Sequence, residues 1–131
     1  MNRSNYDEAC DDWALIRWRG AVTRAIRGKR GQAFLKELLE TLDAMPQKEL
    51  IEGSLATPAG EVCAIGSVMI KRGLDVVGLD SYDSTQIACK LGIADALVRE
   101  IEFVNDWGFQ TVETRFERVR SWVQEHIQQA S

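Results

Sequence analysis

The chain has 131 residues, with 16 lysines and arginines against 20 aspartates and glutamates, and a formal net charge of −4. Its hydrophobic fraction of 45% and charged fraction of 27% are ordinary for a globular protein and exclude an intrinsically disordered chain. The length predicts one helical domain over residues 1–131, large enough to fold without a metal ion or a disulfide bond. No apolar run approaches the roughly 20 residues of a membrane span, so we expect no membrane partner.

The N-terminus and the cysteines predict a cytoplasmic location. Residues 1–12 are polar and acidic, which is not the pattern of a secretory signal peptide. The cysteines are odd in number and far apart, and two of them fall in apolar helical contexts. We therefore expect Cys10, Cys63 and Cys89 to be buried, reduced thiols.

The first third of the chain predicts two helices. Apolar residues follow helical spacing between residues 9 and 26, with acids before them and arginines at the end, as the helix dipole prefers. The segment 28–31 contains two glycines and breaks this pattern. A second amphipathic helix is predicted over residues 32–45 and ends at Pro46. The short gap between the two predicts a helical hairpin.

The middle of the chain predicts a loop followed by a buried helix. Residues 50–60 mix apolar residues with glycine, serine and proline, which indicates a loop or at most one short β-hairpin. Between residues 62 and 70 only Ser67 is polar, and a helix that is apolar all round lies inside a core. Small residues at 64, 66 and 67 would let neighbouring backbones approach closely. We expect this segment to be the central helix.

The last third predicts an extended connection and three more helices. Asp83 or Ser84 would cap a helix over residues 85–91, which Gly92 separates from another over residues 94–105. Thr111 would cap the last helix, with residues 112, 116, 119, 123 and 127 facing inward. The whole pattern predicts an all-α fold, a compact bundle of about five to six helices around the central one.

A basic stretch is the strongest departure from average composition. Between residues 13 and 36 the chain has seven cations and no acid, so the remainder carries a formal charge of −11. Such a stripe, with tryptophans between the cations, is a candidate surface for an anionic partner. A solvated face, or a contact with an acidic protein, explains it as well. The candidate partner-binding residues are Arg17, Trp18, Arg19, Arg24, Arg27, Lys29, Arg30 and Lys36.

Residues 86–101 resemble the helix-turn-helix motif of many bacterial and phage regulators. The alanine at 88, the glycine at 92 and the apolar residues around them fall where that motif places its small residue, turn and core. The second helix departs from it, because a helix that reads bases carries donors at its N-terminal positions. Here the chain has Ala94, Asp95 and Ala96. We therefore predict the geometry of the motif without a DNA-reading surface.

Catalytic and metal-binding patterns are missing from the sequence. There is no Cys-x-x-Cys, His-x-x-x-His or Gly-x-Ser-x-Gly, and the only histidine, His126, is predicted at the surface. The aspartates at 75, 80 and 83 around Tyr82 are interpreted as loop acids and a helix cap, and the turn at 105–108 as a helix stop with a half-buried tryptophan. We predict no catalytic residue, metal site or cofactor, and an enzyme built on carboxylates is the least favoured class.

Several short segments are distinctive when the chain is taken as a whole. They are WRGAV at 18–22, RGKRGQAFL at 27–35, LDAMP at 42–46, GEVCAIG at 60–66, LGIA at 91–94, ND at 105–106 and RVRSWV at 118–123. In these segments the chain resembles small accessory proteins encoded by phages and prophages, a group to which no established activity is attached. That resemblance implies the cytoplasm of a bacterial host as the location and a host or phage protein as the partner.

These observations lead to two functional hypotheses. The first is a non-enzymatic binding protein that occupies a surface on a host or phage macromolecule, for example as an inhibitor of a bacterial defence system such as CRISPR. The second is a DNA-binding regulator that places the 17–36 stretch on phosphates and residues 94–98 in the groove. The sequence leaves the oligomeric state open.

Overall fold

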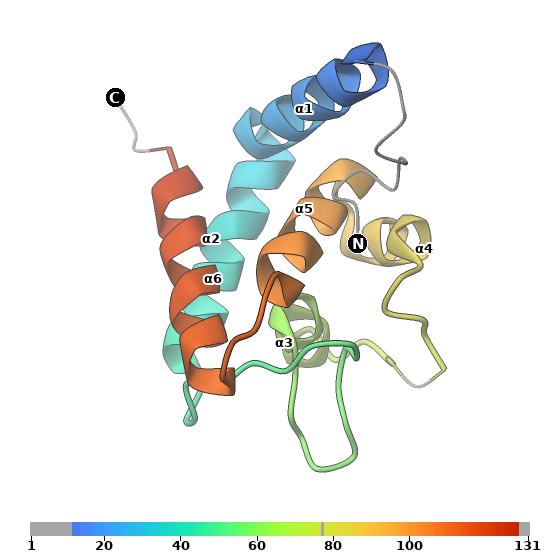
Figure 1. Ribbon diagram of the computed structural model, residues 1–131. Helices are drawn as coiled ribbons and strands as arrows, with labels where there is room; N and C mark the ends of the chain where they lie inside the picture. Colours follow the sequence, from blue (N-terminus) through green and yellow to red (C-terminus); the bar gives the residue numbers. More distant parts are fainter. Residues whose placement is uncertain (1–11, 77, 129–131) are drawn as a thin grey trace.

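The computed structural model describes residues 12–76 and 78–128, the first four of them by their backbone alone. In this part of the chain six α-helices form a bundle and no strand is present, which confirms the predicted all-α fold (Figure 1). The helices are α1 Asp12–Arg27, α2 Lys29–Ala44, α3 Ala64–Lys71, α4 Ser84–Leu91, α5 Asp95–Asp106 and α6 Val112–His126.

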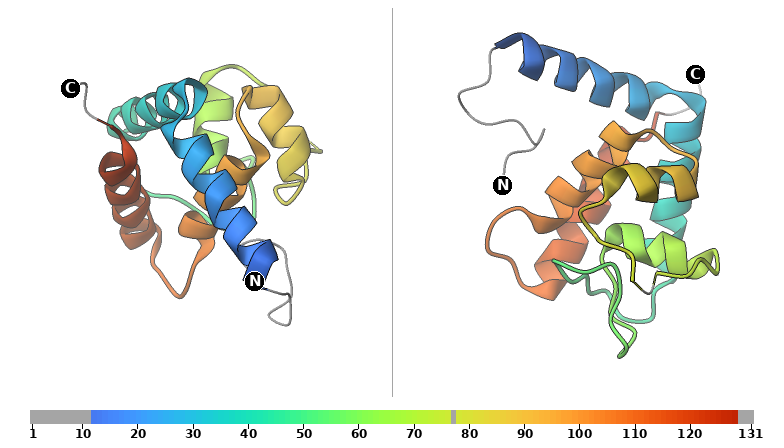
Figure 2. Two further views of the ribbon diagram at one scale, coloured as in Figure 1. Left: turned by 90° about the horizontal axis from the view of Figure 1, so that it is seen from above. Right: turned by 90° about the vertical axis from the view of Figure 1, so that its right-hand side faces the viewer.

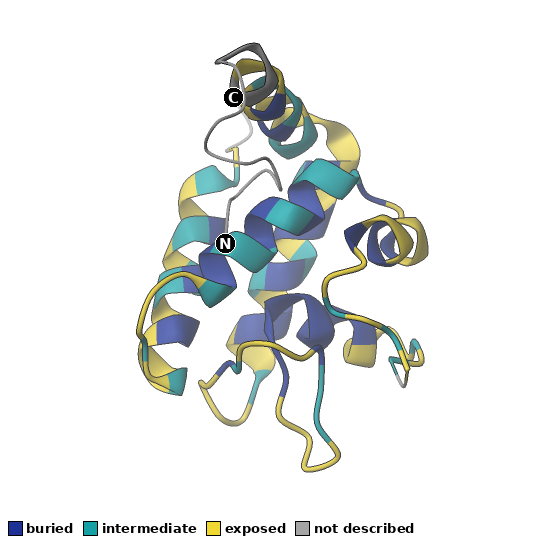
Figure 3. Ribbon diagram, turned by 45° about the vertical axis from the view of Figure 1, so that its right-hand side comes forward, coloured by how far each residue is buried: buried dark blue, intermediate teal, exposed yellow. Residues whose placement is uncertain are grey.

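Helix α5 occupies the centre of the bundle. It packs against α1, α3, α4 and α6, while α2 packs against α3 and α6 on one side (Figures 1 and 2). No residue of α5 is exposed, and Figure 3 shows the helix in the colours of buried and intermediate residues only. Helix α1 crosses over the N-terminal part of α5 and closes this end of the core.

The predicted buried helix is confirmed at α3, but the central position predicted for it belongs to α5, which more helices surround. Every residue from Val62 to Met69 is buried, between α2, α5 and the 50–60 loop. A Cβ atom on Gly66 would lie 1.8 Å from the carbonyl oxygen of Leu55, so the loop reaches α3 only because this residue has no side chain. The prediction fails at Ile70, which is 48% exposed because it lies on the side of α3 away from the core.

The 50–60 segment is a loop with a single antiparallel bridge between Ala56 and Val62, and no hairpin strands form. The side chain of Asn105 holds it against α3. Its Oδ1 accepts a hydrogen bond from the Ala64 backbone N–H at 3.0 Å, and its Nδ2 donates to the Ile51 carbonyl oxygen at 2.9 Å. These bonds satisfy one free N–H at the start of α3.

The later helix boundaries follow the predicted caps. The Asp83 side chain accepts from the Gln86 backbone N–H, and Gly92 ends α4 with a φ of 73°. Thr111 and Thr114 form a reciprocal capping box at the start of α6. None of the helices in the described part of the chain is both long and apolar enough to cross a lipid bilayer.

Candidate binding surface on the first helical hairpin

The turn between α1 and α2 is tighter than the sequence predicts. The predicted break at 28–31 is a single extended residue, Gly28, and α2 begins at Lys29. Gly31 lies inside the helix, where a Cβ atom would lie 1.8 Å from the Ala25 carbonyl oxygen. The glycine therefore permits close contact of two helices and does not interrupt one.

The half-buried side-chain amide of Gln32 links this hairpin to the rest of the bundle. The Nε2 group of Gln32 donates to the Ile26 carbonyl oxygen at 2.7 Å and to the His126 carbonyl oxygen at 3.0 Å. Its Oε1 accepts from the Gln128 backbone N–H at 2.7 Å. The end of α1, the start of α2 and the end of α6 consequently form one fixed unit beside the cations.

All seven cations of the basic stretch are exposed, as the sequence predicts; these residues are called the hairpin cations below: Arg17, Arg19, Arg24, Arg27, Lys29, Arg30 and Lys36. Apart from Arg17, which has an interaction partner, none makes a hydrogen bond or an ion pair within the described residues. Each of the six exposed cations other than Arg17 is available to an anionic group of a partner.

Two acids of α2 are engaged by cations from elsewhere in the bundle. Arg72 donates two hydrogen bonds to Glu37, one of them at 2.9 Å, and this lowers the pKa of that carboxyl group. Arg120 donates to Asp43 at 2.6 Å and lowers its pKa in the same way. These carboxylates therefore do not neutralise the hairpin cations.

Trp18 does not belong to this surface. The prediction that Trp18 contacts a partner assumed an exposed side chain, and this assumption is wrong. The side chain is only 7% exposed, and the guanidinium carbon of Arg99 on α5 lies 5.7 Å from its ring centroid. It shares the inner face of α1 with Val22, four residues later. The indole Nε1 is buried with no acceptor in the described part of the molecule. The side chain of Trp13 lies outside the described residues.

The predicted helix-turn-helix segment corresponds to α4, α5 and the turn between them. Gly92 ends α4, and α4 and α5 pack against each other, but α5 is enclosed by four other helices. Its first turn contains Asp95, which pairs with Arg99 at 3.2 Å. A helix in this position cannot enter a DNA groove without the removal of α1. This burial argues against the proposed use of residues 94–98 in base reading.

The cysteine prediction is correct for Cys63 and wrong for Cys89. Cys63 is buried, and its Sγ accepts from the Gly66 backbone N–H at 3.3 Å at the start of α3. Burial raises the pKa of this thiol to about 12. Cys89 is exposed because it lies on the outer face of α4. Cys10 lies outside the described residues.

His126 is half-buried and not a simple surface residue. Its ring stacks on Trp122 with the centroids 4.4 Å apart, and its Nδ1 lies 2.6 Å from the Trp122 carbonyl oxygen. No group of three or more histidine, cysteine or acidic side chains is arranged to hold a metal ion among the described residues.

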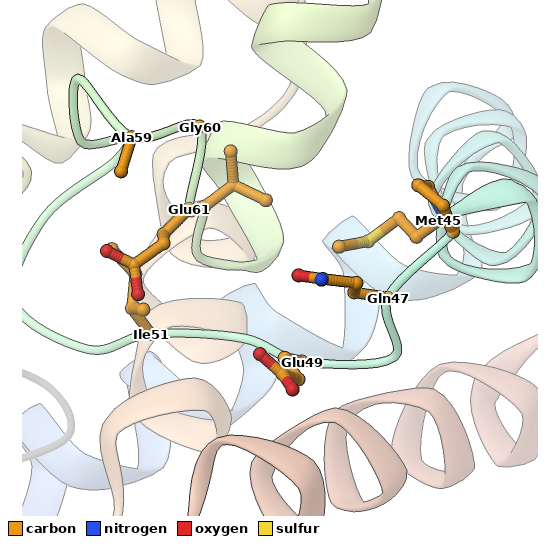
Figure 4. A pocket seen from close by; sticks show the side chains of 9 residues that line it. Met45, Gln47, Glu49, Ile51, Ala59, Gly60 and Glu61 are labelled. Carbon is orange, nitrogen blue, oxygen red and sulfur yellow. The ribbon is translucent and has the colours of Figure 1, made fainter.

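A shallow pocket of about 270 Å³ lies where α2 leads into the 50–60 loop (Figure 4). Its carboxylates come from Glu49 and Glu61, and Met45 and Ile51 supply apolar surface. The lining includes no hydroxyl, thiol, amine or imidazole group that would act as a nucleophile beside those acids. We therefore prefer the hairpin cations to this pocket as the candidate functional site.

No family model matches this chain, and no curated protein or solved structure shows significant similarity to it.

Proposed function

We propose that this protein is a non-enzymatic binding protein that docks the α1–α2 hairpin on an anionic surface of a macromolecule. The observation that supports the proposal most strongly is that all seven hairpin cations are exposed, and that the six other than Arg17 make no hydrogen bond or ion pair among the described residues. The remainder of the chain carries a formal charge of −11. Five of the hairpin cations are arginines, and a guanidinium group is suited to carboxylate or phosphate groups, which accept paired hydrogen bonds from it.

An acidic surface of a host or phage protein is the partner that we favour. The net charge of −4 opposes general attraction to nucleic acid, and α5, the helix expected to enter a groove, is enclosed by other helices. Electrostatic contact with a protein requires only a local patch of opposite charge. Nucleic acid bound through its phosphates by the same hairpin is the second candidate, because seven cations within twenty residues suit a charged backbone.

The test is affinity capture from a host lysate, with and without nuclease treatment, using the wild-type chain and two charge variants. Arg24→Gln with Arg27→Gln removes two hairpin cations. The control, Lys71→Gln with Lys90→Gln, removes two exposed cations elsewhere on the molecule. We expect a nuclease-resistant protein that the first variant captures poorly and the control captures normally. Loss of the captured material on nuclease treatment would favour the second candidate, and equal capture by both variants would refute the role of the hairpin.

The resemblance to phage-encoded proteins suggests a context for this binding, the inhibition of a bacterial defence system. The support for that context is the set of sequence segments that carry the resemblance. The test is expression of the chain in bacteria that use CRISPR against a targeted phage. We expect plaque numbers to rise with the wild-type chain and not with the Arg24→Gln, Arg27→Gln variant. Unchanged plaque numbers with the wild-type chain would refute the inhibition of a defence system. They would not refute the proposal that the hairpin cations bind a partner.

A further inference from the structure

A second pocket, of about 340 Å³, is formed by two features that the sequence analysis treated as unrelated loops. The turn after α5 brings Trp107 and Gly108 to one side, and Tyr82 comes from the loop before α4. The 50–60 loop completes the lining with Glu52 and Gly53, and α5 contributes Phe103 and Asp106. Helix α5 spans twelve residues, or about 18 Å, and the lining residues Phe103 and Asp106 place this pocket at the C-terminal end of the helix. Helix α1 lies over the N-terminal part of α5 (Figure 1).

Three aromatic rings give this pocket its walls. Trp107 is 53% exposed and Tyr82 is 55% exposed, although both are large side chains that monomeric proteins usually cover. The Phe103 and Trp107 ring centroids lie 5.1 Å apart. The Trp107 turn is held in place, because its carbonyl oxygen accepts from Gln110 Nε2 at 2.6 Å and from Arg118 at 3.0 Å. The backbone that carries the Trp107 ring is therefore held in place beside Phe103.

Two carboxylates give the pocket its charge. Asp106 accepts from the Asn105 side chain through Oδ1 at 2.8 Å, and no hydrogen bond to its Oδ2 is present within the described residues. Glu52 Oε2 forms a long ion pair with Nη2 of the buried Arg115, 3.7 Å away, and this distance is too long for a hydrogen bond. Burial raises the pKa of Asp106, and the Glu52 charge adds to that shift. A cation placed between these groups would meet two acceptors and three aromatic faces.

We propose that this pocket binds an arginine side chain of a partner protein. A guanidinium group stacks on aromatic rings and donates paired hydrogen bonds to carboxylates, so it matches both parts of the lining. A metal ion is a poorer match, because no described set of three donor side chains converges here. An apolar occupant would cover Asp106 Oδ2 and the Glu52 carboxylate without offering them a hydrogen-bond donor, which costs free energy. The inference goes beyond the proposed function, since it concerns an oppositely charged site at the other end of α5.

The test is a ¹H–¹⁵N NMR titration of the full chain with N-acetyl-arginine amide, with N-acetyl-citrulline amide as the uncharged isostere. We expect saturable shifts of the Trp107 indole and Gly108 amide signals with the arginine probe only. Trp107→Ala, Asp106→Asn and Glu52→Gln should each weaken the response several-fold, the first being followed at Gly108. Glu52 is exposed, so its variant remains informative if the Asp106 variant does not fold.

Two controls make the result specific. Phe109→Ala removes a fully exposed aromatic ring that lies next to the pocket and does not line it, and should leave the response unchanged. Arg24→Gln with Arg27→Gln should also leave it unchanged, which separates this site from the hairpin surface. Equal shifts with citrulline, no shift with either probe, or pocket signals that move on dilution of the chain alone would overturn the proposal. The last result would show that a second copy fills the pocket.

Discussion

The Nε group of Arg115 donates a hydrogen bond of 2.8 Å to the backbone carbonyl oxygen of Asn105, and both residues are buried. Arg115 also donates to the Leu50 carbonyl oxygen at 3.1 Å, while Asn105 bonds to Ala64 and Ile51. The pair therefore connects α5, α6, the start of α3 and the 50–60 loop. The pocket lined by Tyr82, Phe103 and Trp107, called the aromatic pocket below, is built on this loop and on the end of α5. The hydrogen bonds of Arg115 and Asn105 therefore hold two of the segments that line it.

Asn105→Ala should destabilise the fold by about 3 kcal/mol, because it leaves the buried Ala64 N–H and the Ile51 carbonyl without partners. The free energy of unfolding in urea measures the effect. Gln110→Ala is the control, since this half-exposed side chain makes one hydrogen bond within its own turn. A loss for Asn105→Ala no larger than that of the control would contradict the bracing role of the asparagine.

Two glycine substitutions in the first hairpin should have opposite effects. Gly31→Ala forces a methyl group onto the Ala25 carbonyl and should cost about 2–4 kcal/mol. Gly20→Ala in α1 meets only the mobile end of the Arg24 side chain, at 3.2 Å, and should gain up to about 1 kcal/mol through helix propensity. Thermal unfolding of both variants measures the two signs. Equal effects would mean that α1 and α2 do not approach closely at this turn.

Glu102 should make the stability depend on pH. Burial, and then the charges of Asp106, Asp95 and Asp80 against that of Arg99, raise its pKa from 4.5 to about 8. Between these values the unfolded chain has released the Glu102 proton and the folded chain still holds it, so stability falls as pH rises. Glu102→Gln should therefore be more stable than the wild type at pH 9, by an amount on the order of 2 kcal/mol, and similar to it near pH 4.

Urea unfolding at the two pH values checks this expectation, and Glu117→Gln, an exposed acid on α6, provides the control. If the Glu102 variant and the Glu117 variant changed by the same amount at pH 9, the raised pKa of Glu102 would be refuted.

The two described cysteines should differ in reactivity. Thiolates are the reactive form, and the pKa of about 12 for the buried Cys63 leaves almost none at pH 8. Cys89 is exposed and should react with iodoacetamide in the native protein. Peptide mass mapping after labelling distinguishes the two sites, and labelling in denaturant shows that both thiols are available. Rapid native labelling of Cys63 would contradict the enclosed position of α3.

The sequence predicts where the helices lie more accurately than how they pack against one another. The run of apolar residues identified α3 as buried, and the capping residues marked α4 and α6, because these signals are local. The central place of α5 was missed, because a helix with carboxylates such as Glu100 and Glu102 has the pattern of a surface helix. Only the packing of four other helices around it buries these side chains.

The candidate sites show the same difference between features set by local sequence and features set by packing between distant segments. The exposure of the hairpin cations followed from their number within one stretch, whereas the burial of Trp18 depends on which side of α1 the distant α5 covers. The aromatic pocket was missed because its lining comes from residues 52–53, 82 and 103–108. No spacing within a single segment reveals such an assembly. The signal that was present, an unusual Asp-Trp-Gly turn, has meaning only beside Tyr82.

The central claim is that the hairpin cations bind an anionic partner, and the amount of partner bound by matched charge variants tests it most directly. Removing two exposed contacts of about 0.7 kcal/mol each should weaken binding roughly tenfold. We predict this loss for Arg24→Gln with Arg27→Gln, with a larger difference at low salt than at high salt. Lys71→Gln with Lys90→Gln should bind as the wild type does. Equal binding by the two variants at low salt would contradict the account.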